Sequence, residues 1–143
     1  MKKDMKHIKE KVSLVPQDLA LYMELTGYDN LSFLANLYGL KGTVKKERIY
    51  EAVDIAQLHD VAKKKVGSYS GGMKRRLNLA GGLLNQPEVI FLDEPTVGVD
   101  PQSRNHIFNS IKHLVHELNM SVIYTTHYME EAEALCNRVA IYD

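Results

Sequence analysis

Two adjacent carboxylates, Asp93 and Glu94, follow an apolar run at residues 89–92 and precede a proline. An apolar run of this length predicts a strand that is buried on both faces in the middle of a parallel sheet. Open α/β sheets bind their ligands at the carboxyl edge of the strands, where these two acids are expected to lie. Because adjacent strand residues point to opposite faces, one acid can hold a metal ion while the other addresses a water molecule. This combination is typical of a catalytic site, although solvated acids also end many strands.

Four further polar segments stand in order along the chain. Gln17 follows a weakly alternating apolar stretch at residues 12–15, and the run S-G-G-M at residues 70–73 precedes a helical pattern. Asp100 stands before a proline, and His127 follows two threonines and a second apolar run. Taken singly, each has an ordinary structural explanation: a surface glutamine, a helix N-cap with glycines, an N-cap before a first-turn proline, and a core or surface histidine. A helix that begins at the serine also offers an anion site at its N-terminus.

In this order, the segments resemble the nucleotide-binding domain of ATP-binding cassette (ABC) proteins. On that resemblance the Q-loop is V-P-Q, ending at Gln17, and the signature motif is Y-S-G-G-M-K-R-R, starting at Tyr69. The Walker B strand is V-I-F-L-D-E-P, starting at Val89. The D-loop is V-G-V-D, ending at Asp100, and the histidine switch is T-T-H, ending at His127. Together the motifs cover most of the chain.

The resemblance implies a catalytic role for four residues. Asp93 would hold Mg²⁺ through water, and Gln17 would reach the same ion and the attacking water from a flexible Q-loop. Glu94 would be the general base that polarises this water. His127 would contact the γ-phosphate and steady the water. ATP and Mg²⁺ are the cofactors that this set implies.

The signature motif and the D-loop would act across a dimer. In ABC dimers the signature edge reaches the γ-phosphate that the phosphate loop of the other subunit holds. The resemblance assigns these nucleotide contacts to Ser70, Gly71, Gly72 and Met73, with Asp100 lining the same interface. The methionine, and the tyrosine before the motif serine, differ from the commoner glutamine and leucine of the family. Because the serine and the glycine backbone carry most of the phosphate contact, we expect the motif to remain competent.

The sequence contains no G-x-x-x-x-G-K-[ST] phosphate loop in its 143 residues. In the family this loop precedes the Q-loop and supplies backbone amides and a lysine for the β- and γ-phosphates. Only sixteen residues precede Gln17. We therefore expect an internal fragment of a longer cassette, with Met1 an internal methionine or a miscalled start. On its own the fragment is expected to be inactive.

Composition bounds the remaining possibilities. Eighteen basic residues balance eighteen acidic ones, so no global field attracts nucleic acid or an anionic membrane. An apolar share of 45% and a charged share of 25% are those of a globular protein. A single cysteine excludes an internal disulfide. No apolar stretch has the length of a membrane span or the pattern of a signal peptide, which predicts a cytoplasmic location.

The elements expected to position these residues fall into two lobes. Residues 1–18 contain a strand and the Q-loop, residues 19–68 form a helical subdomain, and residues 69–143 carry the signature helix, Walker B, D-loop and histidine switch. Past residue 87 the pattern is β-α-β, with a helix over about residues 101–118. The predicted fold class is α/β: a partial P-loop NTPase-like parallel-sheet lobe with an ABC-type α-helical subdomain.

Several local features are predicted as well. Asp29 is expected to cap a helix that Gly39 ends. The glycine pair at residues 81–82 inside the signature helix predicts a close approach to a neighbouring element, because each glycine costs roughly 1 kcal/mol of helix propensity. The basic run at residues 74–76 is expected on the exposed side of that helix. Residues 138–142 are expected to begin another strand.

The leading hypothesis is the ATP-binding subunit of a bacterial ABC transporter, an ATPase that couples hydrolysis to transport. The expected partners are a second ABC ATPase subunit, in a homodimer or heterodimer, and a transmembrane permease subunit, with no nucleic acid. The subunit would be cytoplasmic and peripheral on the cytoplasmic face of the cell membrane. The run N-L-Y-G-L at residues 36–40 and the signature helix resemble the exporter-type (ABC-2-like) branch that serves drugs, sodium or polysaccharides.

Two alternatives stay open. A non-transport ABC ATPase of the repair or translation type shares the signature and Walker B motifs. Chromosome-type members carry a long coiled coil where this chain has about fifty residues, and translation-type members are twin-cassette chains. A non-catalytic dimerising module would keep the signature edge and pair with an intact cassette.

Overall fold

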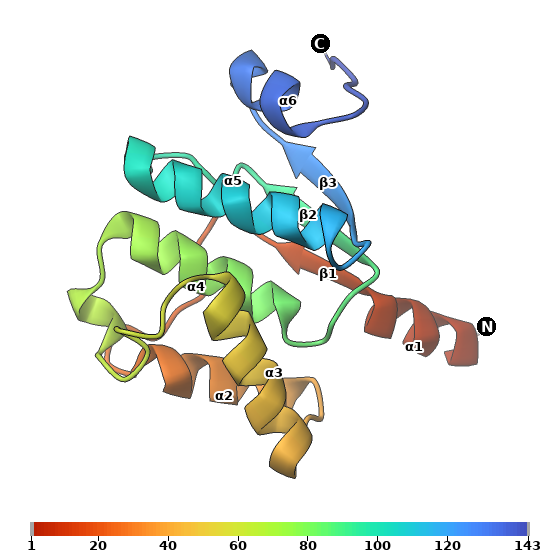
Figure 1. The fold of residues 1–143 in the computed structure, drawn as a ribbon. Helices are drawn as coiled ribbons and strands as arrows, with labels where there is room; N and C mark the ends of the chain where they lie inside the picture. Colours follow the sequence, from red (N-terminus) through yellow and green to blue (C-terminus); the bar gives the residue numbers. More distant parts are fainter. Residues whose placement is uncertain (1, 143) are drawn as a thin grey trace.

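Three short parallel strands form the centre of the molecule (Figure 1). The structure is a computed structural model that describes residues 2–142. In chain order the elements are α1 (Lys2–Lys11), β1 (Val12–Val15), α2 (Gly27–Leu37), α3 (Gly42–Ile55), the short 3₁₀ helix η1 (Val66–Ser68), α4 (Gly71–Leu83), β2 (Val89–Asp93), α5 (Pro101–His116), β3 (Ser121–Thr125) and α6 (Met129–Leu135). The mixture of helices with a parallel sheet confirms the predicted α/β class.

The strand order β1-β2-β3 places the Walker B strand in the middle of the sheet. Val15 of β1 pairs with Leu92 of β2, and Leu92 pairs in turn with Tyr124 of β3. Because all three strands run in the same direction, their carboxyl ends lie at one edge of the sheet. The segments that follow these ends are therefore neighbours, although more than a hundred residues separate the first from the last.

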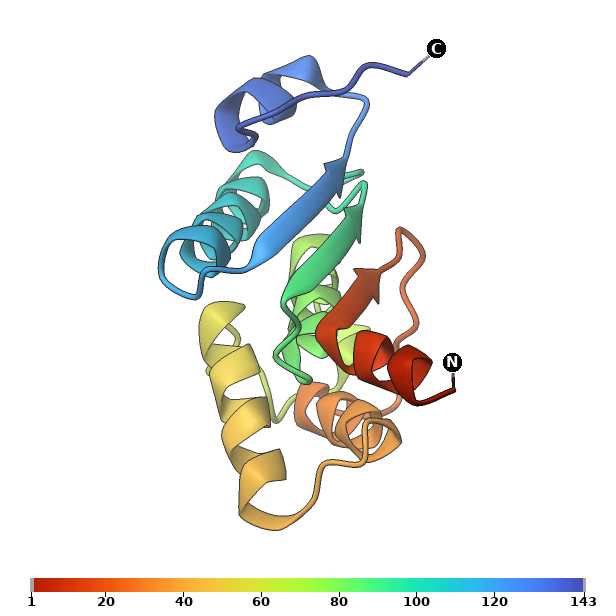
Figure 2. The same cartoon turned by 90° about the vertical axis from the view of Figure 1, so that its right-hand side faces the viewer.

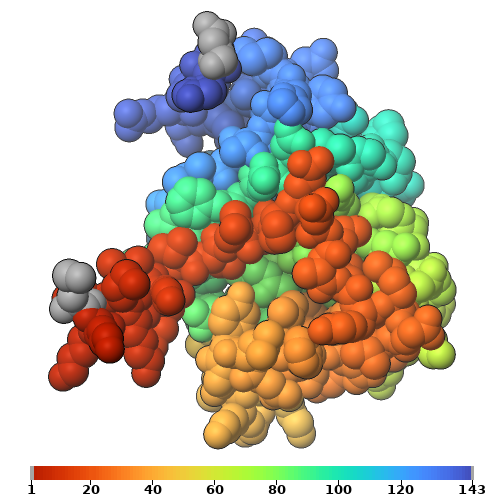
Figure 3. All heavy atoms as spheres, turned by 180° about the vertical axis from the view of Figure 1, so that it is seen from behind, coloured from red at the N-terminus to blue at the C-terminus, as the bar shows by residue number. Residues whose placement is uncertain are grey.

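Only one face of the sheet is covered. Ile90 and Leu92 are buried beneath α4 and α5, together with Val15 of β1. The residues that alternate with them, Leu14 and Phe91, are exposed on the opposite face, which Figure 3 shows from behind. The expectation of a Walker B strand buried on both faces is therefore wrong for the described residues. The physical reason is that α4 and α5 both pack on the same side, and no described element covers the other.

The helical subdomain begins at a different cap from the one predicted. Thr26 is the N-cap of α2, and its Oγ1 accepts a hydrogen bond from the Asp29 backbone N–H at 3.0 Å. Asp29 therefore lies inside the first turn, where an acid also stabilises a helix. Gly39 follows the end of the helix with φ +77°, a conformation that favours glycine and agrees with the predicted stop.

The glycine pair of α4 lies close to neighbouring elements, as predicted. A Cβ added at Gly81 would lie 2.8 Å from Leu34 Cδ1 of α2, and one added at Gly82 would lie 2.5 Å from Val15 Cγ2 of β1. The missing side chains let α4 pack against the helical subdomain and the sheet at the same level. The helix propensity lost at the two glycines is thus exchanged for close packing between the lobes.

The two ends of the chain contribute little to this core. Helix α1 buries none of its side chains and extends away from the sheet (Figure 1), so that it points toward the viewer in Figure 2. Residues 138–142 form no strand, because a strand needs a partner and none of the described strands pairs with them; residue 143 lies outside the described part. Within residues 2–142, no helix combines the length and apolar character that crossing a membrane requires.

Candidate active site

The carboxyl edge of the sheet brings together the predicted catalytic residues. Gln17 follows β1 by two residues, Asp93 ends β2 with Glu94 directly after it, and His127 follows β3 by two residues. Hydrogen bonds or an ion pair join three of these four residues into one group, through a residue that the sequence analysis did not select. That residue is Thr125.

Thr125 contacts both acids of the Walker B strand end. It is the register partner of Asp93, and its Oγ1 donates a hydrogen bond to Asp93 Oδ1 at 2.7 Å. The Glu94 backbone N–H donates to the Thr125 carbonyl oxygen and to Thr125 Oγ1, each at 3.1 Å. Two threonines before the predicted histidine were a visible signal. Only the strand register shows that the first of them lies opposite Asp93.

Glu94 has a strained backbone in this position. Its φ of +44° lies in the left-handed region, which a non-glycine residue avoids at a cost on the order of 1–3 kcal/mol. The two hydrogen bonds from its N–H hold this conformation. Strained backbone of this kind collects at functional sites.

The side chain of Glu94 is paired with His127. Glu94 Oε1 contacts His127 Nε2 in an ion pair when the ring is protonated and in a hydrogen bond otherwise. The Glu94 side chain is only 14% exposed, whereas that of His127 is 83% exposed. The pair therefore consists of a sheltered carboxylate and a solvent-exposed imidazole. This arrangement suits a base that takes a proton from a water molecule at the sheet edge.

The Asp93 carboxylate is suited to a magnesium ion. It is exposed at the strand end, and while Oδ1 accepts from Thr125, Oδ2 has no hydrogen-bond partner among residues 2–142. In that same part of the chain no three acidic, histidine or cysteine side chains form a metal-binding group. A Mg²⁺ ion fits such a site because it is often held by one or two carboxylates, with water and phosphate oxygens completing its coordination.

Gln17 lies at this edge but is held by its backbone. Its carbonyl oxygen accepts a hydrogen bond from Arg75 Nη1, and the Pro16 carbonyl accepts one from Asn78 Nδ2 at 3.1 Å. Both donors belong to α4. Its amide side chain makes no hydrogen bond to any described residue, so its approach to a metal or water remains a prediction.

The sequence predicted that the basic run at residues 74–76 lies on the exposed side of α4. The structure instead places two of its side chains against other segments. Arg75 is half-buried against the Q-loop, and Arg76 donates from Nη1 to the carbonyl oxygens of Ala56 and Gln57, at 3.2 and 3.1 Å. Burial lowers the pKa of Arg76, an effect that the nearby Asp100 counteracts. Long cationic side chains here satisfy backbone carbonyls of neighbouring segments.

The signature residues form a second group, apart from the first. Ser70 is the N-cap of α4, and its Oγ accepts from the Met73 N–H at 3.2 Å. A Cβ added at Gly72 would lie 2.0 Å from Ser103 Oγ in the first turn of α5. Asp100 caps that helix by accepting from the Ser103 N–H at 3.1 Å. The N-termini of α4 and α5 thus meet, and no described hydrogen bond or ion pair links this group to Asp93 or Glu94.

In this second group, exposure agrees with an anion site at the N-terminus of α4, whereas the N-terminus of α5 already holds a carboxylate. The backbone and hydroxyl hydrogen bonds from Ser103 hold the pKa of Asp100 below its ordinary value. Gly71, between the cap and Gly72, is exposed, and a Cβ added there would meet no atom within 4 Å. The positive dipole end of α4 is therefore open to an anion, while Asp100 occupies the corresponding end of α5.

The tyrosine that departs from the commoner signature leucine has a structural explanation. Tyr69 is buried, its hydroxyl donates to the Val61 carbonyl oxygen, and burial raises its pKa. A Cβ at Gly27 would lie 2.3 Å from the Tyr69 hydroxyl oxygen. The phenol therefore ties the signature segment to the start of the helical subdomain. Met73 packs half-buried against the core.

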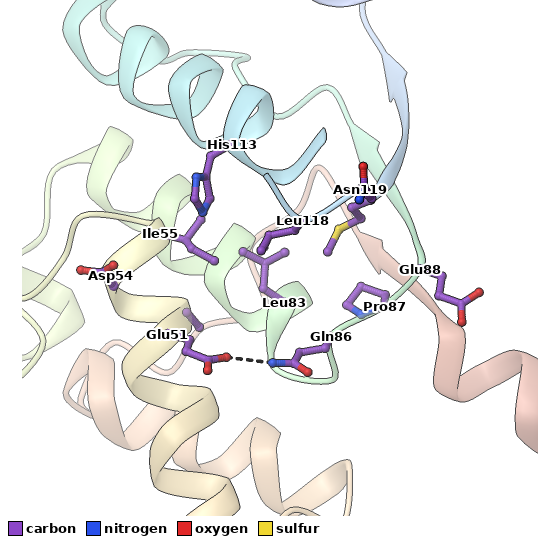
Figure 4. Close-up of a pocket in the computed structure, with 12 residues that line it drawn as sticks. Glu51, Asp54, Ile55, Leu83, Gln86, Pro87, Glu88, His113, Leu118 and Asn119 are labelled. Carbon is purple, nitrogen blue, oxygen red and sulfur yellow. Dashed lines mark hydrogen bonds between the residues drawn. The ribbon is translucent and has the colours of Figure 1, made fainter. Parts of the chain in front are cut away.

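A cavity of about 510 Å³ lies at the opposite edge of the sheet (Figure 4). It lies between α3, the end of α4 and the end of α5, where Glu51 accepts a hydrogen bond from Gln86 at 2.8 Å. Glu88 and Met120 place it beside the amino ends of β2 and β3. None of the predicted site residues lines this cavity, and ligands of open parallel sheets bind at the other edge. The candidate active site is therefore the carboxyl edge.

Comparison with known proteins identifies relatives of this chain. A profile of the domain family described as ABC transporter matches residues 1–97. The linearmycin resistance ATP-binding protein LnrL of Bacillus subtilis (strain 168) is 50% identical over 135 residues, which cover 94% of this chain and 43% of LnrL. The chain thus spans less than half the length of this curated relative.

Two solved structures share the fold. The protein cbiO1 from Clostridium perfringens, part of the ABC transporter complex cbiONQ, superposes with a TM-score of 0.83 at 27% identity, covering 96% of this chain and 55% of that one. The ATP-binding cassette MJ0796, a dimer bound to ADP and Pi, superposes with a TM-score of 0.76 at 27% identity. That match covers 94% of this chain and 60% of MJ0796.

Proposed function

The chain belongs to the ABC transporter family, and on that premise we propose that it supplies the catalytic edge of an ATPase that drives transport across a membrane. The observation that carries this proposal is the group at the carboxyl edge. Glu94 is sheltered, strained and paired with His127, and Asp93 is joined to it through Thr125. No such arrangement is needed to end a strand with solvated acids.

Each residue has a task in this reaction. The oxygen of the attacking water bonds to the γ-phosphorus and its proton passes to the Glu94 carboxylate. The bond between the γ-phosphorus and the bridging oxygen breaks, and ADP leaves with that oxygen. His127 orients the glutamate and reaches the γ-phosphate from its exposed position. Asp93 and Gln17 would hold Mg²⁺, which would neutralise charge on the phosphates when bound.

A second ATPase subunit would complete the site. ABC cassettes form dimers and work with membrane components, as the dimeric MJ0796 and the cbiONQ complex illustrate. We assign the dimer edge to Ser70, Gly71, Gly72 and Met73 at the N-terminus of α4, with Asp100 beside them. These residues are separate from the catalytic group in one chain, which fits a site shared between two chains.

The membrane partner in this proposal is a transmembrane permease, with the ATPase peripheral on the cytoplasmic face of the cell membrane. The resistance role in the name of LnrL supports the exporter-type branch. The transported substrate, the direction of transport and the identity of the permease are properties of a whole transporter, and the relatives are longer than this chain. They therefore belong to the proposal for the whole transporter.

The decisive test is turnover of a complete cassette that combines these residues with a phosphate loop. Glu94→Gln keeps the size of the side chain but removes the base, so ATP hydrolysis should fall ~10²–10⁴-fold while ATP binding persists. The matched control is Glu88→Gln, at the opposite end of the same strand, which should leave turnover unchanged. Near-normal turnover of Glu94→Gln would refute the assignment of the base.

The chain by itself offers a second test. Calorimetric titration of the 143-residue chain with MgATP should give no detectable heat, since its sequence lacks the phosphate-loop pattern. The same titration with Glu94→Gln should also be silent. Saturable binding to either protein would mean that a phosphate site exists where the proposal has none.

A further inference from the structure

One buried acid has no task in the mechanism above. Glu131 lies on α6, four residues after His127, and only 3% of its side chain is exposed. Burying a carboxylate is costly unless its oxygen atoms are hydrogen-bonded and its charge is compensated. The partners of Glu131 therefore indicate what the burial accomplishes.

Three hydroxyl groups donate to this carboxylate. Thr96 Oγ1 donates to Glu131 Oε1 at 2.5 Å, and Tyr124 and Thr126 donate to Oε2 at 2.8 and 2.9 Å. Arg104 Nε of α5 lies 3.8 Å from Oε1, close enough for attraction but too far for a hydrogen bond. Hydroxyl groups that donate to a charged acceptor make the stronger class of hydrogen bond.

Two of these donors, Thr96 and Thr126, come from the two loops that carry the catalytic pair, and the third, Tyr124, lies in β3. Thr96 is two residues after Glu94, in a turn closed by the bond from the Val97 N–H to the Glu94 carbonyl oxygen at 3.3 Å. Thr126 directly precedes His127. A single carboxylate thus connects the loop after β2 with the loop after β3, one through each of its oxygen atoms.

The hydroxyl of Thr126 makes this connection directional. It donates to Glu131 and at the same time accepts from the Tyr128 backbone N–H at 3.0 Å. His127 lies inside the small turn that these two bonds close. Because the hydroxyl has one proton, its donation to Glu131 leaves its lone pairs for the Tyr128 amide. Burial raises the pKa of Tyr124 well above its ordinary value, so that hydroxyl also remains a donor.

We infer that Glu131 is the positioning residue of the catalytic edge: by holding Thr96 and Thr126 at once, it sets the distance at which His127 meets Glu94. This inference rests on the proposed function for its catalytic consequence, but its structural half stands on the hydrogen bonds alone. Glu131 touches neither substrate nor the reacting atoms. Its effect reaches the chemistry only through the two loops.

The substitution Glu131→Gln separates this role from simple packing. It preserves shape but replaces one acceptor oxygen with an N–H₂ donor. If the new N–H₂ group faces Thr126, the Thr126 hydroxyl loses the acceptor for its proton. The new N–H₂ group and the Tyr128 backbone N–H then compete for the lone pairs of this hydroxyl. If the N–H₂ group faces Thr96, the loop after Glu94 loses its bond instead. In either orientation one of the two loops is released.

Amide hydrogen exchange of the chain tests the structural half. In Glu131→Gln one of two amides should exchange on the order of tenfold faster or more, as expected when a hydrogen bond to a charged group is lost. The amide of Tyr128 responds if the loop after β3 is released, and the amide of Val97, which closes the turn after Glu94, responds if the loop after β2 is released. Amides in the middle of α3 should be unaffected. Glu130→Gln, an exposed acid on the same helix, is the matched control and should change neither. Unchanged exchange at both Tyr128 and Val97, or an equal increase throughout the chain, would overturn the inference.

A milder pair of variants covers the case in which Glu131→Gln does not fold. Thr126→Val removes the hydroxyl at nearly constant volume and should reproduce the faster exchange at Tyr128. Thr126→Ser retains the hydroxyl and should restore slow exchange. Equal exchange rates of the Tyr128 amide in the two variants would mean that the Thr126 hydroxyl, which donates to Glu131, does not hold the turn.

Turnover of a complete cassette tests the catalytic half. Glu131→Gln should lower kcat with little change in KM for ATP, and it should cause no further loss in a Glu94→Gln background. An additive loss in that background would contradict action through Glu94. Absence of ATPase activity in the unmodified cassette would refute the proposed function, while the exchange experiment would still decide whether Glu131 holds the two loops.

Discussion

The catalytic edge and the signature edge of this chain are built in opposite ways. At the catalytic edge, side chains hold one another through hydrogen bonds and an ion pair, with Thr125 joining Asp93 to Glu94. At the signature edge, the absence of side chains lets two helices meet, because Gly72 leaves room for Ser103. The stability of the catalytic edge should therefore fall when polarity is removed at constant side-chain size. The stability of the signature edge should fall when side-chain size is added at constant polarity.

The largest effect on stability is expected at Gly72. Gly72→Ala places a Cβ 2.0 Å from Ser103 Oγ and 2.3 Å from Ser103 Cβ, and the Cβ cannot rotate away. Because the clash involves a Cβ as well as a hydroxyl, the overpacking cost should lie at the upper end of the range of about 1–3 kcal/mol. The gain in helix propensity, about 1 kcal/mol, then leaves a net loss of about 2 kcal/mol. Urea denaturation should therefore show a clear net loss of unfolding free energy.

The neighbouring glycine supplies the control for this prediction. Gly71→Ala meets no atom within 4 Å and should be neutral or slightly stabilising. In a double-mutant cycle, Ser103→Gly should recover much of the loss caused by Gly72→Ala. Equal stability of the two alanine variants would contradict this difference between the edges, since the signature edge would then not depend on close packing.

A somewhat smaller effect is expected where the signature segment meets the helical subdomain. Gly27→Ala brings a Cβ to 2.3 Å from the Tyr69 hydroxyl oxygen and 3.3 Å from the Ala62 carbonyl oxygen. We expect a loss of about 1–2 kcal/mol in thermal or urea unfolding, part of which Tyr69→Phe should relieve by removing the hydroxyl. If Tyr69→Phe does not reduce the effect of Gly27→Ala, the clash lies elsewhere.

The catalytic edge should respond to lost polarity by a modest amount. Thr125→Val keeps the volume and the strand propensity but removes the hydroxyl that donates to Asp93. Because the residue is exposed, we expect a loss of only about 0.5–1.5 kcal/mol in urea unfolding. Thr125→Ser, which keeps the hydroxyl, should lose less. The reverse order would show that volume, not hydrogen bonding, matters at this edge.

The smallest effect is expected from the cap at Asp100 and depends on pH. Its pKa is lowered in the folded chain by hydrogen bonds from Ser103, so its contribution is present above the unfolded-state pKa and is lost as pH falls through the folded-state pKa. Asp100→Asn should therefore be slightly less stable than the natural chain at neutral pH. The two unfolding free energies should converge in strong acid. A difference that grows as the pH falls would reverse the assigned sign.

The local elements followed from the sequence where one signal dominated. The apolar runs at residues 12–15 and 89–92 and the run that begins at residue 121 are strands, and Ser70 and Asp100 are the caps that their positions predicted. Where two signals competed, the sequence could not choose. Asp29 was predicted to be the cap of α2, but Thr26, three residues earlier, has the extended backbone of an N-cap and forms a β-bridge with the distant Lys65. The basic run at residues 74–76 was misjudged because its carbonyl partners are distant in the chain.

By itself, the sequence determined the order of the motifs, the α/β pattern and the presence of Asp93, Glu94 and His127 at strand ends. Those properties are local, since periodicity and capping act over a few residues. Only the tertiary structure decided that Thr125 lies opposite Asp93, that Glu94 is strained against it, and that Glu131 joins the loops beside Glu94 and His127. Strand register and helix docking determine these contacts, and both depend on residues far apart in the chain.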